Sequence, residues 1–122
     1  MKITTFLVFS AAVLSANAAT AQTACTKPTE PAAVDGKGST MDQLLAAKTS
    51  VTGFIAASDT WQTCALADLK TRQDAAKAAS MPLDPSVEKG VHDSIADNQA
   101  AKERVGKWFN TAVKDYKTAH PG

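Results

Sequence analysis

Apolar residues recur at helical spacing through two long stretches of the chain, residues 40–79 and 85–119. At about 100° per residue, the apolar positions of each stretch fall on one side of an α-helix. On the first stretch these positions are Leu44, Val51, Ile55, Ala65, Leu66 and Leu69, flanked by Phe54 and Trp61. On the second they are Val87, Val91, Ile95, Val105, Phe109, Ala112 and Tyr116. Each pattern predicts a long helix with one face directed at a core.

Both predicted helices have sequence signals at their ends. Thr40 followed by Gln43 is a capping-box pattern, in which each side chain accepts a hydrogen bond from the backbone of the other residue. Pro82 disfavours helix at the residue before it, and Pro85 behind Asp84 fits the first position of a new helix. A turn this short folds the second helix back along the first. The sequence therefore predicts an all-α protein, an antiparallel two-helix hairpin of the coiled-coil type.

Reflection of the chain about the turn predicts which residues of the two helices are neighbours. The predicted pairs are Leu69 with Ile95, Ile55 with Phe109, and Val51 with Val113. Four polar residues also lie within the stripes, namely Ser58, Gln62, Ser94 and Asn98. Buried polar residues of this kind fix the register of coiled coils. A pocket for a small polar ligand at the level of Gln62 and Asn98 is the alternative.

The first 21 residues have the layout of a secretory signal peptide. Lys2 precedes an apolar run from Ile3 to Ala16, and small residues follow it. Cleavage after Ala21 is expected, so that the mature chain begins at Gln22. The apolar run is shorter than the roughly 20 residues that a membrane-spanning helix needs. We therefore expect a periplasmic or secreted protein.

Charge and length limit what the mature chain does. The 13 basic and 12 acidic residues become 12 of each once Lys2 is removed. A neutral chain without a nucleic-acid-binding module is not expected to bind nucleic acid. Roughly 100 residues make at most one small domain, which is short of buried area. We therefore expect a covalent staple, a partner, or both; the partner would be a second copy in a homodimer or another envelope protein.

Cys25 and Cys64 are the only cysteines, and in an exported chain a disulfide between them is the simplest expectation. A lipid anchor on Cys25 and a free thiol are the alternatives. Residues 22–39 contain two prolines and two glycines and read as an extended arm.

The expected path of the arm follows from the projection of the first helix. Cys64 lies roughly 140° from the centre of the apolar stripe, at about 100° per residue, and so faces away from the second helix. From Cys25 to Thr40 the arm extends up to about 50 Å, and the helix from Thr40 to Cys64 spans about 36 Å. The arm is therefore expected to run back along the first helix, over its small residues Gly53, Ala57 and Thr60.

No residue pattern indicates an active site. The chain lacks a CxxC motif, a phosphate-binding glycine loop and a G-x-S-x-G motif. His92 and His120 are expected to be exposed, without a Cys, Asp, Glu or second His at zinc-type spacing on a shared face. Asp93 and Asp97 share a helical face that is expected to be solvated. We therefore expect no enzyme, no cofactor and no metal site.

The segment 102–117 is basic and amphipathic. One face holds the apolar residues, including Trp108, Phe109 and Tyr116, while Lys107 and Lys114 lie on the opposite side. This pattern is typical of a helix that lies in an anionic membrane interface, and equally of a packed helix with charges outside. Packing is favoured because the first helix supplies an apolar mate. The candidate interaction residues are Trp61, Trp108, Phe109, Tyr116, Lys107 and Lys114.

The second predicted helix is also asymmetric in charge. Residues 84–101 carry four acids and one base, and residues 102–120 carry five bases and two acids. This arrangement complements the helix dipole, and it would also orient two such helices antiparallel. The function expected from the sequence is that of a non-enzymatic, exported helical interaction or structural protein. The alternatives are a membrane-surface or lipid-binding protein that uses residues 102–117, and a helical bundle that binds a small ligand.

Overall fold

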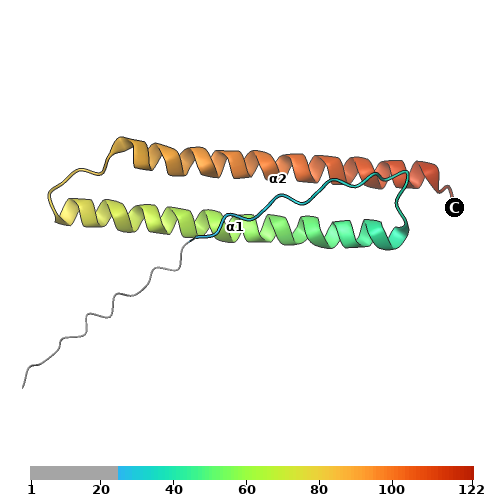
Figure 1. Ribbon diagram of the computed structural model, residues 1–122, viewed down its shortest axis with the longest axis horizontal. Helices are drawn as coiled ribbons and strands as arrows, with labels where there is room; N and C mark the ends of the chain where they lie inside the picture. The colour runs from blue at the N-terminus through green and yellow to red at the C-terminus, as the bar shows by residue number, and fades with distance from the viewer. Residues whose placement is uncertain (1–24) are drawn as a thin grey trace, which may run out of the picture.

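A computed structural model describes residues 25–122 and contains two helices, α1 (Met41–Ala78) and α2 (Pro85–Ala119). The two helices pack side by side and antiparallel along their length, and the described residues contain no strand (Figure 1). The predicted all-α, two-helix hairpin is therefore confirmed. The expected signal peptide, residues 1–21, and the first three residues of the expected arm lie outside the described residues.

The helices begin at the caps that the sequence signals predict. The Thr40 backbone N–H donates to Gln43 Oε1 at 2.9 Å, and the Gln43 N–H donates to Thr40 Oγ1 at 3.2 Å, which completes the capping box. Asp84 accepts from the Ser86 N–H at 2.9 Å, and Pro85 opens α2. The hydrogen bonds from Ser86 hold the pKa of Asp84 below its ordinary value of 3.8, because they favour the charged carboxylate.

The end of α1 contains a left-handed residue that is not glycine. Ser80 has a φ of 52°, and the Met81 N–H donates to the Ala76 carbonyl at 3.0 Å while the Ser80 N–H donates to the Lys77 carbonyl at 3.1 Å. These two bonds form the reversal that commonly ends a helix, in which glycine usually occupies the left-handed position. A serine there carries a conformational cost that glycine would not have.

The centre of the core lies between the first half of α1 and the middle of α2. Val51, Phe54, Ala101 and Val105 form a buried cluster, and three half-buried residues pack against it, Ile55, Trp108 and Phe109. The buried positions of α1 are Leu44, Ala47, Val51, Phe54, Ser58, Trp61 and Leu69.

The buried stripe of α1 is rotated from the predicted one. Phe54 and Trp61, expected at its flank, are buried, whereas Leu66, expected within it, is 46% exposed. The inclusion of Leu66 in the core stripe is therefore wrong. Val51 also shares its cluster with Val105 and not with its predicted neighbour Val113, which is half-buried outside that cluster. The rotation arises because α1 packs against two neighbours, α2 and the arm.

A chain of buried polar side chains joins the two helices near their middle. Gln62 Nε2 donates to Asn98 Oδ1 at 2.8 Å, and Asn98 Nδ2 donates to Ser58 Oγ at 3.1 Å. Ser58 and Asn98 are almost fully buried. Any sliding of one helix along the other would break both bonds and leave buried polar groups unpaired, which is costly. These residues therefore fix the register of the hairpin.

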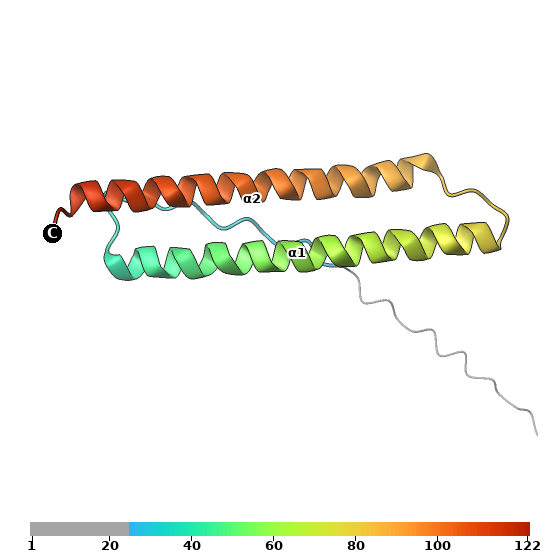
Figure 2. The same ribbon diagram turned by 180° about the vertical axis from the view of Figure 1, so that it is seen from behind.

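The arm, residues 25–39, covers one side of the helix pair. It runs in front of the two helices in Figure 1 and behind them in Figure 2, from the middle of the hairpin to the end where α1 begins. A disulfide joins Cys25 to Cys64, 39 residues further along the chain, with the two Cα atoms 5.7 Å apart. The predicted staple is therefore confirmed.

The path of the arm differs from the expected one. A Cβ atom on Gly36 would lie 1.9 Å from the Ala112 carbonyl oxygen, so the backbone of the arm touches the backbone of α2. A Cβ on Gly53 would meet no atom within 4 Å, and Ala57 and Thr60 are exposed. The expectation that the arm covers Gly53, Ala57 and Thr60 is wrong. On its actual path the arm meets Trp61 of α1 and Arg104 of α2, whereas the expected path offers only small side chains.

Candidate functional site

The side of the hairpin that faces the arm is closed by polar and aromatic contacts. Lys27 Nζ lies 5.4 Å from the centre of the Trp61 ring, and Arg104 Nη2 donates to Glu30 Oε2 at 2.8 Å. The hydrogen bond and the charge of Glu30 raise the pKa of the Arg104 guanidinium. Phe54 lies beneath this part of the arm, in a shallow hollow lined by Lys27, Glu30 and Arg104 among others. We call this side the arm face.

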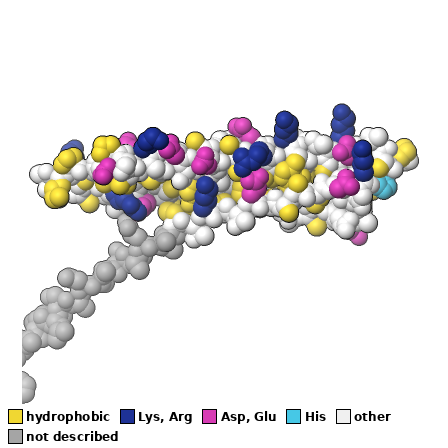
Figure 3. Space-filling view, turned by 45° about the horizontal axis from the view of Figure 1, so that its top comes forward, with side chains coloured by type: hydrophobic (Ala, Val, Ile, Leu, Met, Phe, Trp, Pro, Cys, Tyr) yellow, Lys and Arg dark blue, Asp and Glu magenta, His cyan; other side chains and the backbone are white. Residues whose placement is uncertain are grey.

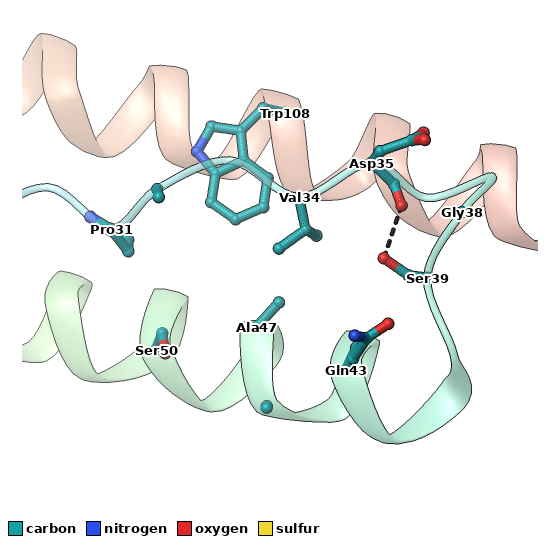
Figure 4. Close-up of a pocket in the computed structure, with 11 residues that line it drawn as sticks. Pro31, Val34, Asp35, Gly38, Ser39, Gln43, Ala47, Ser50 and Trp108 are labelled. Carbon is teal, nitrogen blue, oxygen red and sulfur yellow. Dashed lines mark hydrogen bonds between the residues drawn. The ribbon is translucent and has the colours of Figure 1, made fainter.

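A groove of about 640 Å³ runs along the arm face between the arm and the first turns of α1. Figure 4 shows the indole ring of Trp108 projecting from α2 into this space, and Val34 of the arm pointing toward Ala47. Ser39 Oγ donates to the Asp35 carbonyl at 2.6 Å and holds the bend that leads into α1. Charged side chains project along the hairpin with apolar side chains between them (Figure 3). The groove contains no pair of groups suited to acid–base chemistry.

The opposite side of the hairpin is not covered by any described segment (Figure 2). Its position follows from two contacts: Asp59 pairs with Lys102, and Gln62 with Asn98, while Phe54 and Trp61 border the arm. Residues three and four positions apart share a helical face. On α1 this stripe comprises Leu45, Lys48, Thr52, Ile55, Asp59, Gln62 and Leu66. On α2 it comprises Lys102, Gly106, Phe109, Val113 and Tyr116. We call these twelve residues together the open face.

The open face carries apolar side chains that the hairpin itself only partly buries. Leu45 is 53% exposed and Leu66 is 46% exposed, and Ile55, Phe109 and Val113 are half-buried. On α1 these apolar residues alternate with Lys48, Thr52, Asp59 and Gln62, so the open face is a mixed apolar and polar surface. Single exposed apolar residues are ordinary on protein surfaces, but several on one uncovered side mark a candidate interaction site. The sequence pattern predicts Ile55, Leu66 and Phe109 on the core-facing stripes and does not single out Leu45.

The aromatic candidates all take part in packing. Trp61 is buried under Lys27, and the Trp108 and Phe109 rings meet edge to face with their centres 6.1 Å apart against the core cluster. The half-buried Tyr116 stacks on His120 at 4.3 Å. The rings of Trp108 and Phe109 are thus in contact with each other, whereas Trp61 lies in α1.

The basic candidates lie apart from the core. Lys107 and Lys114 are exposed on the outer side of α2. Neither they nor the exposed Lys117 form an ion pair with any described residue. Lys102, by contrast, reaches across the open face to Asp59, and its side chain is only 17% exposed.

His92 has an acidic neighbour on the same helical face. Glu88 lies one helical turn before His92, on a shared face, with Glu88 Oε1 3.9 Å from His92 Nε2. The expectation that His92 shares a helical face with no acidic residue is therefore wrong. Two groups do not make a metal site, however, and no group of three potential ligands occurs among the described residues.

Neither helix in residues 25–122 is long and apolar enough to cross a bilayer. Comparison with known protein families, with curated proteins and with solved structures finds no match to this chain. The open face, on the uncovered side of the hairpin, is therefore the candidate site.

Proposed function

We propose that this chain is a non-enzymatic, exported interaction protein that binds a protein partner through the open face. The observation that carries the proposal is the asymmetry of the hairpin. The arm covers one side of the helix pair from the middle of the hairpin to the start of α1. No described segment covers the other side, which retains the half-exposed Leu45 and Leu66 and the half-buried Ile55, Phe109 and Val113.

The whole uncovered side of the hairpin, of which the open face is one part, is as large as a protein interface. Two helices of this length are about 50 Å long and together about 20 Å wide, which gives roughly 1,000 Å². A standard interface buries about 800 Å² on each partner. Covering the apolar part of this area stabilises a complex by about 25 cal/mol for each Å² removed from water, before the cost of association.

The polar groups of the open face favour a protein over a small ligand. Asp59 is paired with Lys102, and Gln62 with Asn98, so these side chains bind each other and leave no convergent unpaired group. No buried side-chain polar atom among the described residues lacks a hydrogen-bond partner. A ligand-binding bundle would instead direct unpaired polar groups into a cavity.

A lipid surface is the second candidate, favoured by three exposed and unpaired lysines of α2, which are Lys107, Lys114 and Lys117. Because Trp108 and Phe109 pack against the core, contact with lipid would be electrostatic. Each lysine near an anionic surface contributes about 1 kcal/mol, so three give only weak binding. Cosedimentation with anionic vesicles tests this candidate.

Photo-crosslinking in cells that export the chain tests the main proposal. A benzophenone amino acid is placed at Leu45 or at Leu66 on the open face, and at Met81 in the turn as a matched control. Met81 is 69% exposed, more than either leucine, so exposure alone would favour the control. We expect discrete protein adducts from Leu45 and Leu66 and none from Met81. An equal pattern at all three positions, or no adduct at the leucines, would refute the proposal.

A further inference from the structure

We infer that the partner on the open face is a second copy of this chain, packed antiparallel about a two-fold axis that passes beside the Asp59–Lys102 ion pair. This inference depends on the proposed function, because it uses the same face. It adds the identity of the partner and the register of the complex.

The position of the ion pair supplies the first argument. Asp59 lies half-way along α1, Met41–Ala78, and Lys102 lies half-way along α2, Pro85–Ala119. A two-fold axis at this level, perpendicular to the helices, places α1 along the full length of α1 of the second copy. It places α2 along the full length of α2 of the second copy in the same way. Any other level would leave the end of each hairpin uncovered. The symmetric register therefore buries the largest area.

The apolar residues of α2 supply the second argument. Reflection about Lys102 brings Phe109 to the level of Ile95 of the second copy, and Val113 to the level of Val91 of the second copy. All four of these side chains are half-buried in the single hairpin, so each has area left to bury. Ile95 and Val91 precede Lys102 by seven and eleven residues, which places them on the stripe that borders the open face. Apolar side chains thus meet apolar side chains on both sides of the axis.

Charge selects the antiparallel orientation. Residues 84–101 carry four acids and one base, and residues 102–120 carry five bases and two acids. An antiparallel contact between two α2 helices brings Lys117 beside Glu88 of the second copy. Asp97 and Arg104 face the arm and take no part in this contact. A parallel contact would set like charges together. At the axis, the two Lys102 side chains each retain their own Asp59. The α2 part of the patch is therefore its own complement, as a two-fold interface requires.

Sedimentation equilibrium of the chain from residue 22, with its disulfide intact, tests the identity of the partner. We expect twice the mass of a single chain. Leu66→Glu, which puts charge into the open face, should weaken the dimer at least tenfold, whereas Met81→Glu in the turn should leave it unchanged. A single-chain mass at every concentration would overturn the inference. That result would not refute the proposed function, which the photo-crosslinking experiment tests separately. The mass of the adducts would then identify a partner other than this chain.

Cysteine crosslinking tests the register. Tyr116→Cys and Glu88→Cys are made separately, and a maleimide crosslinker of about 8 Å is added to each variant alone and to their mixture. In the antiparallel dimer the two Tyr116 positions lie about 40 Å apart, because 28 residues of helix separate them at 1.5 Å per residue. We expect a crosslink only in the mixture. Crosslinks within each variant alone would indicate a parallel dimer, and no crosslink in a proven dimer would indicate another face; either result overturns the register.

Discussion

Removal of the disulfide is predicted to release the arm and leave the two helices in place. The perturbation is the double variant Cys25→Ser with Cys64→Ser, which leaves no unpaired thiol. The bond closes a loop with a sequence separation of 39 residues. On the chain-entropy account, a loop of this size stabilises the folded state by about 4 kcal/mol.

The remaining anchors of the arm are weak. Lys27 over Trp61 and the exposed pair of Glu30 with Arg104 hold its first half, and the contact of Gly36 with α2 holds its second. Ordering the arm costs about 1–2 kcal/mol per residue in backbone entropy. Without the bond, these contacts do not offset that cost, so the arm separates from the helix pair.

The helices themselves do not depend on the arm. Val51, Ala101 and Val105 pack between α1 and α2, and the hydrogen bonds of Asn98 cross the same interface. The variant should therefore remain helical at low temperature. Trp61 should lose its cover and become accessible to solvent.

Urea unfolding followed by circular dichroism measures the loss, at a fixed protein concentration because association also stabilises the chain. We expect the free energy of unfolding to fall by about 4 kcal/mol, with a red shift in tryptophan fluorescence before unfolding. The chemically reduced wild type should behave like the variant, which controls for the serine side chains. An unchanged midpoint, or loss of the helical signal at low temperature, would refute the reasoning.

Four further predictions concern single residues. Gly36→Ala should displace the second half of the arm and cost about 1–3 kcal/mol, since its Cβ would overlap the backbone of α2. Gly38→Ala, whose Cβ would meet only a flexible side chain at 3.0 Å, should cost much less, and thermal melts compare the two variants. Asn98→Ala should cost about 2–3 kcal/mol in urea unfolding because it leaves buried polar partners unpaired, and a neutral result would mean that the polar contact does not hold the register. Ser80→Gly should raise stability by up to about 1 kcal/mol by relieving a left-handed serine, and a lower melting temperature would contradict this account. The pKa of the Asp84 carboxyl is lowered in the folded state, so this group contributes stability that is fully present above its unfolded pKa, near 3.8. That stability is lost as the pH falls through the lower folded pKa. Asp84→Asn should remove this part of the acid dependence, which urea midpoints across this pH range will measure.

Local signals in the sequence determined the helical architecture. The capping box of Thr40 with Gln43 and the cap of Asp84 with Pro85 act within a few residues of chain. Local hydrogen bonds and fixed proline dihedrals decide such features without reference to the rest of the fold. The disulfide could also be predicted from the sequence, because two cysteines allow a single pairing.

The tertiary structure alone decided which face of α1 is buried. A helical projection finds the most apolar direction, and Leu66 lies close to that direction. In the folded chain α1 packs against α2 on one side and the arm on the other, so its buried stripe turns toward Phe54 and Trp61. The backbone contact of Gly36 with Ala112 and the bonds of Asn98 then set the path of the arm and the level of the helices. These contacts join residues from distant parts of the chain. Their energies depend on the arm, α1 and α2 being in place together, and the apolar periodicity of a single segment carries no information about that arrangement.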